Sequence, residues 1–285
     1  MPIATDPSLN RRKLRLALKA ARDKRSLTQR EAADLLDWSL SKIIRIEAGT
    51  VSLSVTDLQA MLRLYEIEEP GVVEELEEAA RGSKGQAWWS DYSDIIAAPF
   101  AQYLGYESAA DTIRAYHPSL IPGLLQTTDY IRALYDAAAP NPNAQKSIDL
   151  RSARQERIYR ENDGTQVSMI VDEAALRRLI GGAAVMRNQL SFIKQMATSQ
   201  RITLRALPFA AGAHDSLDSS FLLLGFQDDE DVLYVAGPNG VLTNRDNREM
   251  VARYQECFED LTDKSLSEEA TISLLDELLE QLRDS

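Results

Sequence analysis

Residues 27–49, LTQREAADLLDWSLSKIIRIEAG, contain two short amphipathic segments separated by a break. Thr28 is followed three residues later by Glu31, the spacing of a capping box, in which each side chain accepts a hydrogen bond from the backbone N–H of the other residue. This pair predicts a helix that begins near Gln29. The apolar side chains of that helix recur at the spacing of one buried face: Ala32, Leu35 and Leu36.

The break after this helix has the residues of a tight turn. Asp37 tolerates the left-handed backbone conformation, and Trp38 is a large apolar anchor. Ser39 can cap a second helix over residues 40–48, and Gly49 can end it. The segment is therefore predicted to be a helix, a turn and a helix.

The second helix has one apolar face and one polar face. Ile43 and Ile46 are three residues apart and should face the core. Ser41, Lys42 and Arg45 then fall on the outer side. A helical hairpin in another all-α domain would have the same two helices, but the caps, the turn and the outward basic residues together favour a helix-turn-helix motif.

In a DNA-binding helix-turn-helix, the second helix contacts base edges in the major groove and the first lies across the phosphates. Lys42 and Arg45 can donate hydrogen bonds to guanine, and Leu40 can touch a thymine methyl group. The partner expected from this motif is double-stranded DNA. We expect the DNA contacts to come from eight residues: Thr28, Gln29, Arg30, Ser39, Leu40, Ser41, Lys42 and Arg45.

The charge is distributed unevenly along the chain. Residues 1–65 carry 12 Lys and Arg against 7 Asp and Glu, a net charge of +5, whereas the remaining residues carry 20 against 37, a net charge of −17. The two parts account for the total of −12. Cationic side chains gain by releasing the counterions condensed on DNA, so only the first part is suited to phosphates, and the acidic remainder should stay off the DNA.

The overall composition is that of a soluble globular protein. The chain has 285 residues, 44% hydrophobic and 27% charged, which is enough for about two domains. No apolar run reaches the roughly 18 residues of a membrane span, and the N-terminus lacks the apolar core of a signal peptide. We expect a cytoplasmic, nucleoid-associated protein with no membrane partner. One cysteine, Cys257, excludes an internal disulfide and a multi-cysteine zinc site.

The best linker is GSKGQA, residues 82–87, because glycine, serine and lysine replace the apolar periodicity there. It separates a helix-turn-helix DNA-binding domain, residues 1–81, from a regulatory domain, residues 88–285. The expected fold class is mainly α with a smaller β part: an all-α first domain followed by an α+β second domain.

The second domain should contain about four strands with helices on one side. SSFLLLGFQ and DVLYVAGP, joined by an acidic turn, look like a hairpin. The segment from Ile148 to Glu161 reads as a polar helix, and its arginines could bind an anionic ligand or nucleic acid, or form a solvated face. The carboxylates that alternate with them favour the solvated face. The arginines are Arg151, Arg154, Arg157 and Arg160.

Aromatic residues are dense at the start of the second domain. Such density usually fills a core, but part of it can line a small-molecule pocket or a partner groove. The candidate effector or partner surface consists of six residues: Trp88, Trp89, Tyr92, Phe100, Tyr103 and Tyr106.

No motif points to catalysis. The two histidines, His117 and His214, are nearly one hundred residues apart, and no HExxH or GxSxG sequence occurs. His214 lies near Asp215 and Asp218, which would suit a metal or a base, but a polar loop before a strand explains the same residues. We therefore expect no catalytic residue, no metal and no cofactor, and an enzyme is a remote alternative.

Two resemblances add to these observations. TQREAADLL and WSLSKIIRIEAG resemble the Cro/cI-type (xenobiotic-response-element) helix-turn-helix family, with Asp37 in place of the usual turn glycine, and with Leu40 and Ile44 where polar residues are common. LGYESAADTIRAYHPSLIPGLLQTTDYIRAL, RQERIY, VDEAALRR, LPFAAGAH and SSFLLLGF resemble the C-terminal domain of WhiJ-like actinobacterial regulators.

The resemblance implies a transcription regulator of development or antibiotic production with an antitoxin-like C-terminal regulatory domain, often paired with a small, antitoxin- or toxin-like partner protein. Together with the motif, it leads us to expect a repressor that binds an inverted repeat as a homodimer. The second domain would dock the small partner protein or, alternatively, bind a small-molecule effector. An enclosed pocket between the aromatic segment and the sheet would favour the effector, whereas a flat apolar patch would favour the partner.

Overall fold

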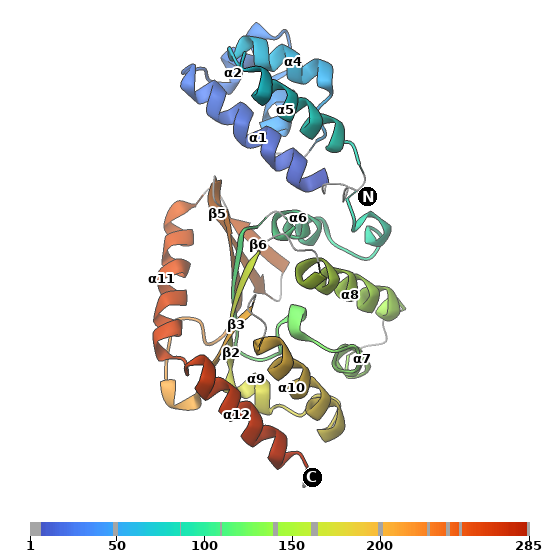
Figure 1. Ribbon diagram of the computed structural model, residues 1–285, viewed down its shortest axis with the longest axis vertical. Coiled ribbons are helices and arrows are strands. Elements are labelled where there is room, and N and C mark those ends of the chain that lie inside the picture. Colours follow the sequence, from blue (N-terminus) through green and yellow to red (C-terminus); the bar gives the residue numbers. More distant parts are fainter. Residues whose placement is uncertain are drawn as a thin grey trace. The chain divides into compact units, whose positions relative to one another are not determined.

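The computed structural model describes residues 7–283 except 48–50, 86, 109, 139–141, 161–164, 199–201, 227–228, 238–239 and 245–246. The chain divides into two compact units, Met1–Asp91 and Tyr92–Ser285 (Figure 1). The first is all-helical, and the second combines a β-sheet with helices, so the expected fold class is confirmed. The linker at 82–87 and the domain boundaries drawn from it stay predictions.

The described part of the first unit is a small helical bundle. Its helices are α1 (Pro7–Lys24), α2 (Gln29–Leu35), α3 (Leu40–Glu47), α4 (Val55–Leu64) and α5 (Pro70–Gly82), and the 3-10 turn η1 (Ser90–Tyr92) follows. Their buried faces share one core, in which Leu18, Ile43, Leu58 and Met61 are fully buried. Ile43 of α3 therefore holds the second helix of the predicted motif against α1 and α4.

The helix-turn-helix segment forms as its capping residues predict. The Thr28 hydroxyl accepts a hydrogen bond from the Glu31 backbone N–H, and the Glu31 carboxylate accepts one from the Thr28 backbone N–H, so the capping box is complete. Asp37 has a left-handed φ of 53°, and the Lys42 backbone N–H donates to the hydroxyl of Ser39. The predicted end of the second helix at Gly49 lies outside the described residues.

The prediction that Leu35 is buried is wrong, because 62% of its surface is exposed. The buried residues of α2 are Ala32 and Ala33. Successive residues of a helix are rotated by about 100° around its axis. Leu36 therefore projects between the two alanines, whereas Leu35 projects roughly 110° away from the midpoint between them. The buried face of α2 is therefore made of small residues, which let α2 and α3 pack closely.

The second unit contains a six-stranded mixed sheet in the order β3-β2-β1-β4-β5-β6. The strands are β1 (Thr112–His117), β2 (Gln166–Asp172), β3 (Ile202–Leu207), β4 (Ser220–Phe226), β5 (Asp229–Gly237) and β6 (Gly240–Asn244). β1, β2 and β3 are parallel, whereas β4 is antiparallel to β1 and forms the predicted hairpin with β5. β6 extends the sheet beyond β5 as a second antiparallel hairpin.

Helices cover both faces of this sheet (Figure 1). α11 (Arg248–Lys264) lies on one face, and α6 (Ala98–Glu107), α8 (Ala144–Arg160) and α10 (Ala183–Ala197) lie on the other. The remaining elements are η2 (Gly123–Leu125), α7 (Thr128–Asp136), α9 (Glu173–Arg177), η3 (Phe209–Ala211) and α12 (Glu268–Gln281). The expectation of about four strands with helices on one side is therefore wrong. The connections between the parallel strands place α8 and α10 on one face, and α11, which follows β6, covers the other.

The two faces of the sheet separate two groups of side chains. Successive residues of a strand point to opposite faces. Tyr116, Phe221 and Leu233 face α11 and pack with Phe258 in one buried cluster. Their sequence neighbours on the strands face α6 and α8, where the packing is less complete and a pocket forms. None of the described helices is long and apolar enough to span a membrane.

Candidate nucleic-acid interface and a pocket in the second unit

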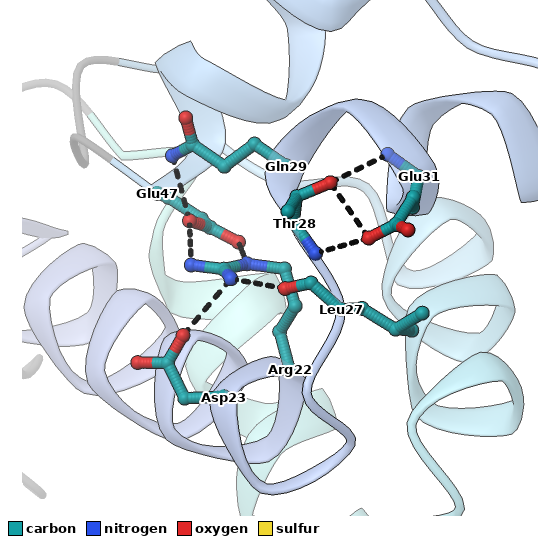
Figure 2. Close-up of polar contacts among 7 residues, drawn as sticks. All are labelled: Arg22, Asp23, Leu27, Thr28, Gln29, Glu31 and Glu47. Atoms are coloured by element: carbon teal, nitrogen blue, oxygen red, sulfur yellow. Dashed lines mark hydrogen bonds and ion pairs between the residues drawn. The ribbon is translucent and has the colours of Figure 1, made fainter.

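A buried ion pair fixes α3 to the two helices that precede it (Figure 2). Arg22 of α1 donates from Nε to one carboxylate oxygen of Glu47 at 2.7 Å and from Nη2 to the other at 3.0 Å. The Gln29 amide, on the first residue of α2, donates to the same carboxylate at 2.9 Å. Only 9% of the Arg22 side chain and 3% of the Glu47 side chain are exposed. Three helices therefore meet at one carboxylate.

The position of Glu47 makes this pair necessary. A carboxylate at the last residue of a helix faces the negative end of the helix dipole, which disfavours it. Arg22 supplies the compensating charge, and its Nη1 also donates to the backbone oxygen of Leu27 at 2.6 Å. The hydrogen bond to Glu47 raises the pKa of Arg22 despite the opposing effect of burial, so Arg22 stays charged. The guanidinium thereby holds the start of α2 and the end of α3 together.

The outer face of α3 is accessible. Ser41, Ile44 and Arg45 are exposed, and 44% of the Ile44 surface is free of protein contacts. The Arg45 guanidinium donates from Nε to the Ser41 backbone oxygen at 3.2 Å, one turn earlier. Ile44 was not among the predicted contact residues, although its position three residues after Ser41 and one before Arg45 indicates the same face. This face presents a hydroxyl, an apolar side chain and a guanidinium.

Lys42, Gln29 and Leu40, which are also predicted to contact DNA, are engaged by other elements of the unit. Lys42 lies over the ring of Trp38, 3.6 Å from its centroid, and pairs with Asp57 of α4 at 2.8 Å. The Gln29 amide is bound to Glu47, and Leu40 is half-buried and packs against the core. A partly exposed ion pair is worth only about 0–1 kcal/mol, so a DNA phosphate can displace Asp57 from Lys42.

The other predicted contacts lie at the start of each helix. Thr28 and Arg30 are exposed at the beginning of α2, and Ser39 is exposed before α3. The positive end of a helix dipole and the free backbone N–H groups at such positions favour anions. Their geometry suits phosphate contacts, and the assignment of each residue stays a prediction.

The structure separates the six aromatic residues of the predicted effector or partner surface. Trp88 and Trp89 contact each other edge to face in the first unit, with ring centroids 5.6 Å apart. In the second unit, Tyr106 packs against Phe226, and only Phe100 and Tyr103 line the pocket. Tyr92, at the start of that unit, is half-buried.

The pocket has a volume of about 120 Å³ and is partly open to solvent. α6 supplies Phe100 and Tyr103, α8 supplies Arg154, and the sheet supplies residues that include His117 and Ser220. The Phe100 and Tyr103 rings stack at 5.6 Å, and the Tyr103 and Tyr234 ring centroids are 4.1 Å apart. The pocket thus has aromatic walls and a small number of polar groups.

A second buried arginine–glutamate pair forms one side of this pocket. Arg154 of α8 donates from Nε to Glu107 of α6 at 2.9 Å and from Nη2 to the same carboxylate at 2.6 Å. Nη2 also donates to the Tyr103 hydroxyl at 3.2 Å. Burial alone lowers the pKa of Arg154, but the Glu107 charge and hydrogen bonds raise it above its ordinary value. Arg154 therefore stays charged inside the unit.

The solvated face expected for the arginines of α8 is wrong at two positions. Arg154 is buried against Glu107, and Arg151 is half-buried and donates to the Gln126 amide oxygen. Burial, and then the charge of Arg154, lower the pKa of Arg151. Arg157 is half-buried as well, and the side chain of Arg160 lies outside the described residues. The sequence could not indicate this arrangement, because the acid that pairs with Arg154 lies 47 residues away.

The histidines lie on opposite faces of the sheet. His117, the last residue of β1, lines the pocket, and burial followed by the Arg154 charge lowers its pKa to about 4. His214 packs on Tyr116, and a hydrogen bond of 3.2 Å joins the His214 Nε2 to the Tyr116 hydroxyl. Within the described residues, no group of three or more His, Cys, Asp or Glu could hold a metal ion.

The arrangement of the first unit defines a class of protein. A capped helix, a left-handed turn and a second helix with an exposed polar face is the layout of helix-turn-helix DNA-binding proteins. A family model described as a helix-turn-helix domain matches residues 13–76. The chain is therefore a helix-turn-helix DNA-binding regulator. The finer Cro/cI-type and WhiJ-like assignments stay predictions.

The second unit identifies the family. The model described as "Domain of unknown function (DUF5753)" matches residues 100–277, more than half of the chain, so the chain belongs to this family. No curated protein matches the chain in the comparison. No solved structure matches it either.

The Arg22–Glu47 pair predicts a specific pattern of stability. Replacing Glu47 by Ala leaves the buried Arg22 guanidinium with only the exposed Asp23 carboxylate, 2.9 Å away, as an acid partner, so the free energy of unfolding of the first unit should fall by up to about 3–5 kcal/mol. The double variant Arg22→Met, Glu47→Leu removes both charges and should recover most of the loss. All three tryptophans lie in the first unit, so denaturant unfolding followed by tryptophan fluorescence reports this unit. A loss as large in the double variant as in Glu47→Ala would contradict the assignment.

His117 predicts an acid sensitivity of the second unit. Its pKa of about 4 lies below the 6.5 of an exposed histidine. The unfolded chain therefore binds the proton more readily, and the stability that neutral His117 contributes above pH 6.5 is lost as the pH falls towards 4. The calorimetric melting temperature of the second unit should fall more between pH 7 and pH 5 in the wild type than in His117→Gln. Parallel curves for the two proteins would refute this role.

Proposed function

We propose that this protein is a sequence-specific transcriptional repressor whose first unit reads DNA through α3 and whose second unit receives the regulatory signal. One observation carries the first part of this proposal. The exposed face of α3 presents Ser41, Ile44 and Arg45 on a helix that the buried Arg22–Glu47 pair and the core hold in place. A rigid helix of this kind suits base recognition, because binding then costs little ordering of the protein.

Each of these side chains fits a chemical role at a base edge. Arg45 can donate two hydrogen bonds to guanine, and Ser41 can bond to several bases. Ile44 can contact the methyl group of thymine, a role that the sequence alone suggested for Leu40. Thr28 and Arg30, at the start of α2, would contact the phosphates that set the register of α3 on the groove.

We further propose that two copies bind an inverted repeat. One α3 helix presents three accessible side chains to the bases, which is a small surface for specific recognition. Two such helices on half-sites one helical turn apart double the contacts and match the symmetry of the operator. The net charge of +5 over residues 1–65, which contain α2 and α3, supports DNA contact through this part of the first unit.

Two candidates exist for the regulatory signal, and the pocket favours one of them. The resemblance to WhiJ-like regulators supports a small partner protein. The pocket of about 120 Å³ between α6, α8 and the sheet supports a small-molecule effector, because it combines aromatic walls with convergent polar groups. We therefore propose control by a small molecule, with the partner protein as the second candidate. The proposal assigns no catalytic role to either unit.

The DNA-binding role predicts a residue-specific loss of sequence recognition. A duplex selected by the wild-type chain from a random library should contain an inverted repeat. On that duplex, at fixed salt, Arg45→Ala should cost about 1–3 kcal/mol of specific binding while affecting unrelated DNA much less. Fluorescence anisotropy with both duplexes measures the two affinities.

Arg63→Ala is the matched control for this experiment. Arg63 is an exposed arginine of α4, so its replacement removes the same charge from the first unit without changing α3. The ratio of specific to non-specific affinity should be unchanged in this variant. If Arg45→Ala keeps the wild-type ratio, α3 does not read the bases and the proposed function fails.

A further inference from the structure

The pocket of the second unit brings hydrogen-bond donors and apolar side chains to one place. Arg154, His117 and Ser220 line it together with Phe100, Met169 and Leu222. α8 supplies the guanidinium, α6 supplies Phe100, and the sheet supplies the other four of these residues. A ligand here would meet polar groups and hydrocarbon at once.

The guanidinium of Arg154 has donor capacity left over. Its Nε and Nη2 are used by Glu107 and by the Tyr103 hydroxyl. Among the described residues, no acceptor bonds to its Nη1. This nitrogen is directed towards Gly123 of η2, where an added Cβ would be 3.6 Å from it. Gly123 itself lines the pocket, so Nη1 is placed to donate to a ligand.

The charge around the pocket does not balance. Arg154 and Arg151 carry two positive charges, and Glu107 carries one negative charge. The described partner of the Arg151 guanidinium is the neutral Gln126 amide, and the Arg151 Nε would be 3.9 Å from the same added Cβ of Gly123. Two guanidinium groups therefore lie close to one glycine, and among the described contacts the acid that pairs with either of them is Glu107, bound to Arg154. One further negative charge would offset the repulsion between them.

The remaining polar groups suit an oxygen acceptor. His117 is neutral at pH 7, because its pKa is about 4, and a neutral imidazole can donate one hydrogen bond without adding charge. Ser220 offers a hydroxyl, which can also donate. The pocket thus presents donors that include Arg154, His117 and Ser220, and the Glu107 carboxylate beside it is occupied by Arg154.

We propose that this pocket binds a small carboxylic acid with a compact aromatic or aliphatic body. The carboxylate accepts hydrogen bonds from Arg154 Nη1, with His117 and Ser220 beside it, and the hydrocarbon packs against Phe100, Met169 and Leu222. The pocket measures about 120 Å³ and is partly open. Because this is less than the cavity of about 150 Å³ that holds a benzene ring, part of the ligand extends through the open side. The binding of this ligand does not depend on the proposed function. Its role as a regulatory effector does.

Matched acids and amides test the ligand class on the full chain without DNA. The probes are benzoate, cyclohexanecarboxylate and 3-methylbutanoate, each compared with its primary amide at equal ionic strength. Isothermal titration calorimetry should give at least one acid that binds about tenfold or more tightly than its amide, because a hydrogen bond to a charged acceptor is the stronger one. The bound acid should also raise the melting temperature of the second unit. Binding of none of the acids, or equal binding of acid and amide, overturns the proposal.

Two variants test the site itself. The double variant Glu107→Leu, Arg154→Met removes the buried pair while keeping its bulk, and it should lose the preference for the acid. Arg157→Met is the control, because it is the same replacement on the same helix at a residue that does not line the pocket. This variant should keep the preference for the acid over the amide. Ser220→Leu fills the pocket without touching the ion pair and should weaken binding of acid and amide alike. An unchanged acid affinity in Ser220→Leu, or an unchanged preference in a folded double variant, overturns the proposal.

The DNA experiments separate the ligand from its regulatory role. Acid binding is measured without DNA, and the affinity for the selected duplex is then measured with and without saturating acid. An acid that binds selectively but leaves the DNA affinity unchanged supports the pocket assignment and contradicts the proposed small-molecule control. If the wild-type chain binds none of the acids but still recognises the selected duplex, the pocket assignment is overturned and the DNA-binding role stands.

Discussion

The buried Arg22–Glu47 pair is the constraint on which the DNA-binding surface depends. Glu47 ends α3, Arg22 belongs to α1, and the Gln29 amide at the start of α2 shares the same carboxylate. The two helices of the motif therefore keep one angle set by a charge pair that is costly to break. The fully buried Ile43 fixes the rotation of α3 about its own axis. Together they determine that Ser41, Ile44 and Arg45 face outward.

The second unit also contains a buried arginine–glutamate pair that joins two helices, but with a different consequence. The Arg154–Glu107 pair joins α8 to α6, but it lies beside a pocket and not within a closed core. The alternation of strand residues explains the difference, because one face of the sheet is closed by α11 and its aromatic cluster while the other keeps space under α6 and α8. In the first unit a buried pair orients a helix, and in the second it holds a charged donor at a binding site.

The sequence predicted local features better than distant ones. The Thr28–Glu31 capping box, the left-handed Asp37 and the β4–β5 hairpin depend on residues a few positions apart, and all three are confirmed. Leu35 was placed on the wrong side of α2, because a seven-residue helix gives too few positions to fix its buried face. The buried role of Arg154 could not be predicted from a polar, arginine-rich helix, since its acid lies on α6 and the fold alone brings the two together. Ile44 is absent from the predicted contacts for a different reason: the contact to a thymine methyl group was expected of Leu40, whereas Leu40 is half-buried and Ile44 is exposed.

Hydrogen–deuterium exchange of the full chain, with and without the selected duplex, tests the central claim most directly. Specific DNA should slow amide exchange over residues 28–47, where α2 and α3 meet the DNA, and leave the strands that line the pocket, β1, β2, β4 and β5, unchanged. A duplex bound with sequence preference that slows exchange only beyond residue 92, with no effect on α2 and α3, would contradict the assignment of the first unit as the DNA-reading part of this protein.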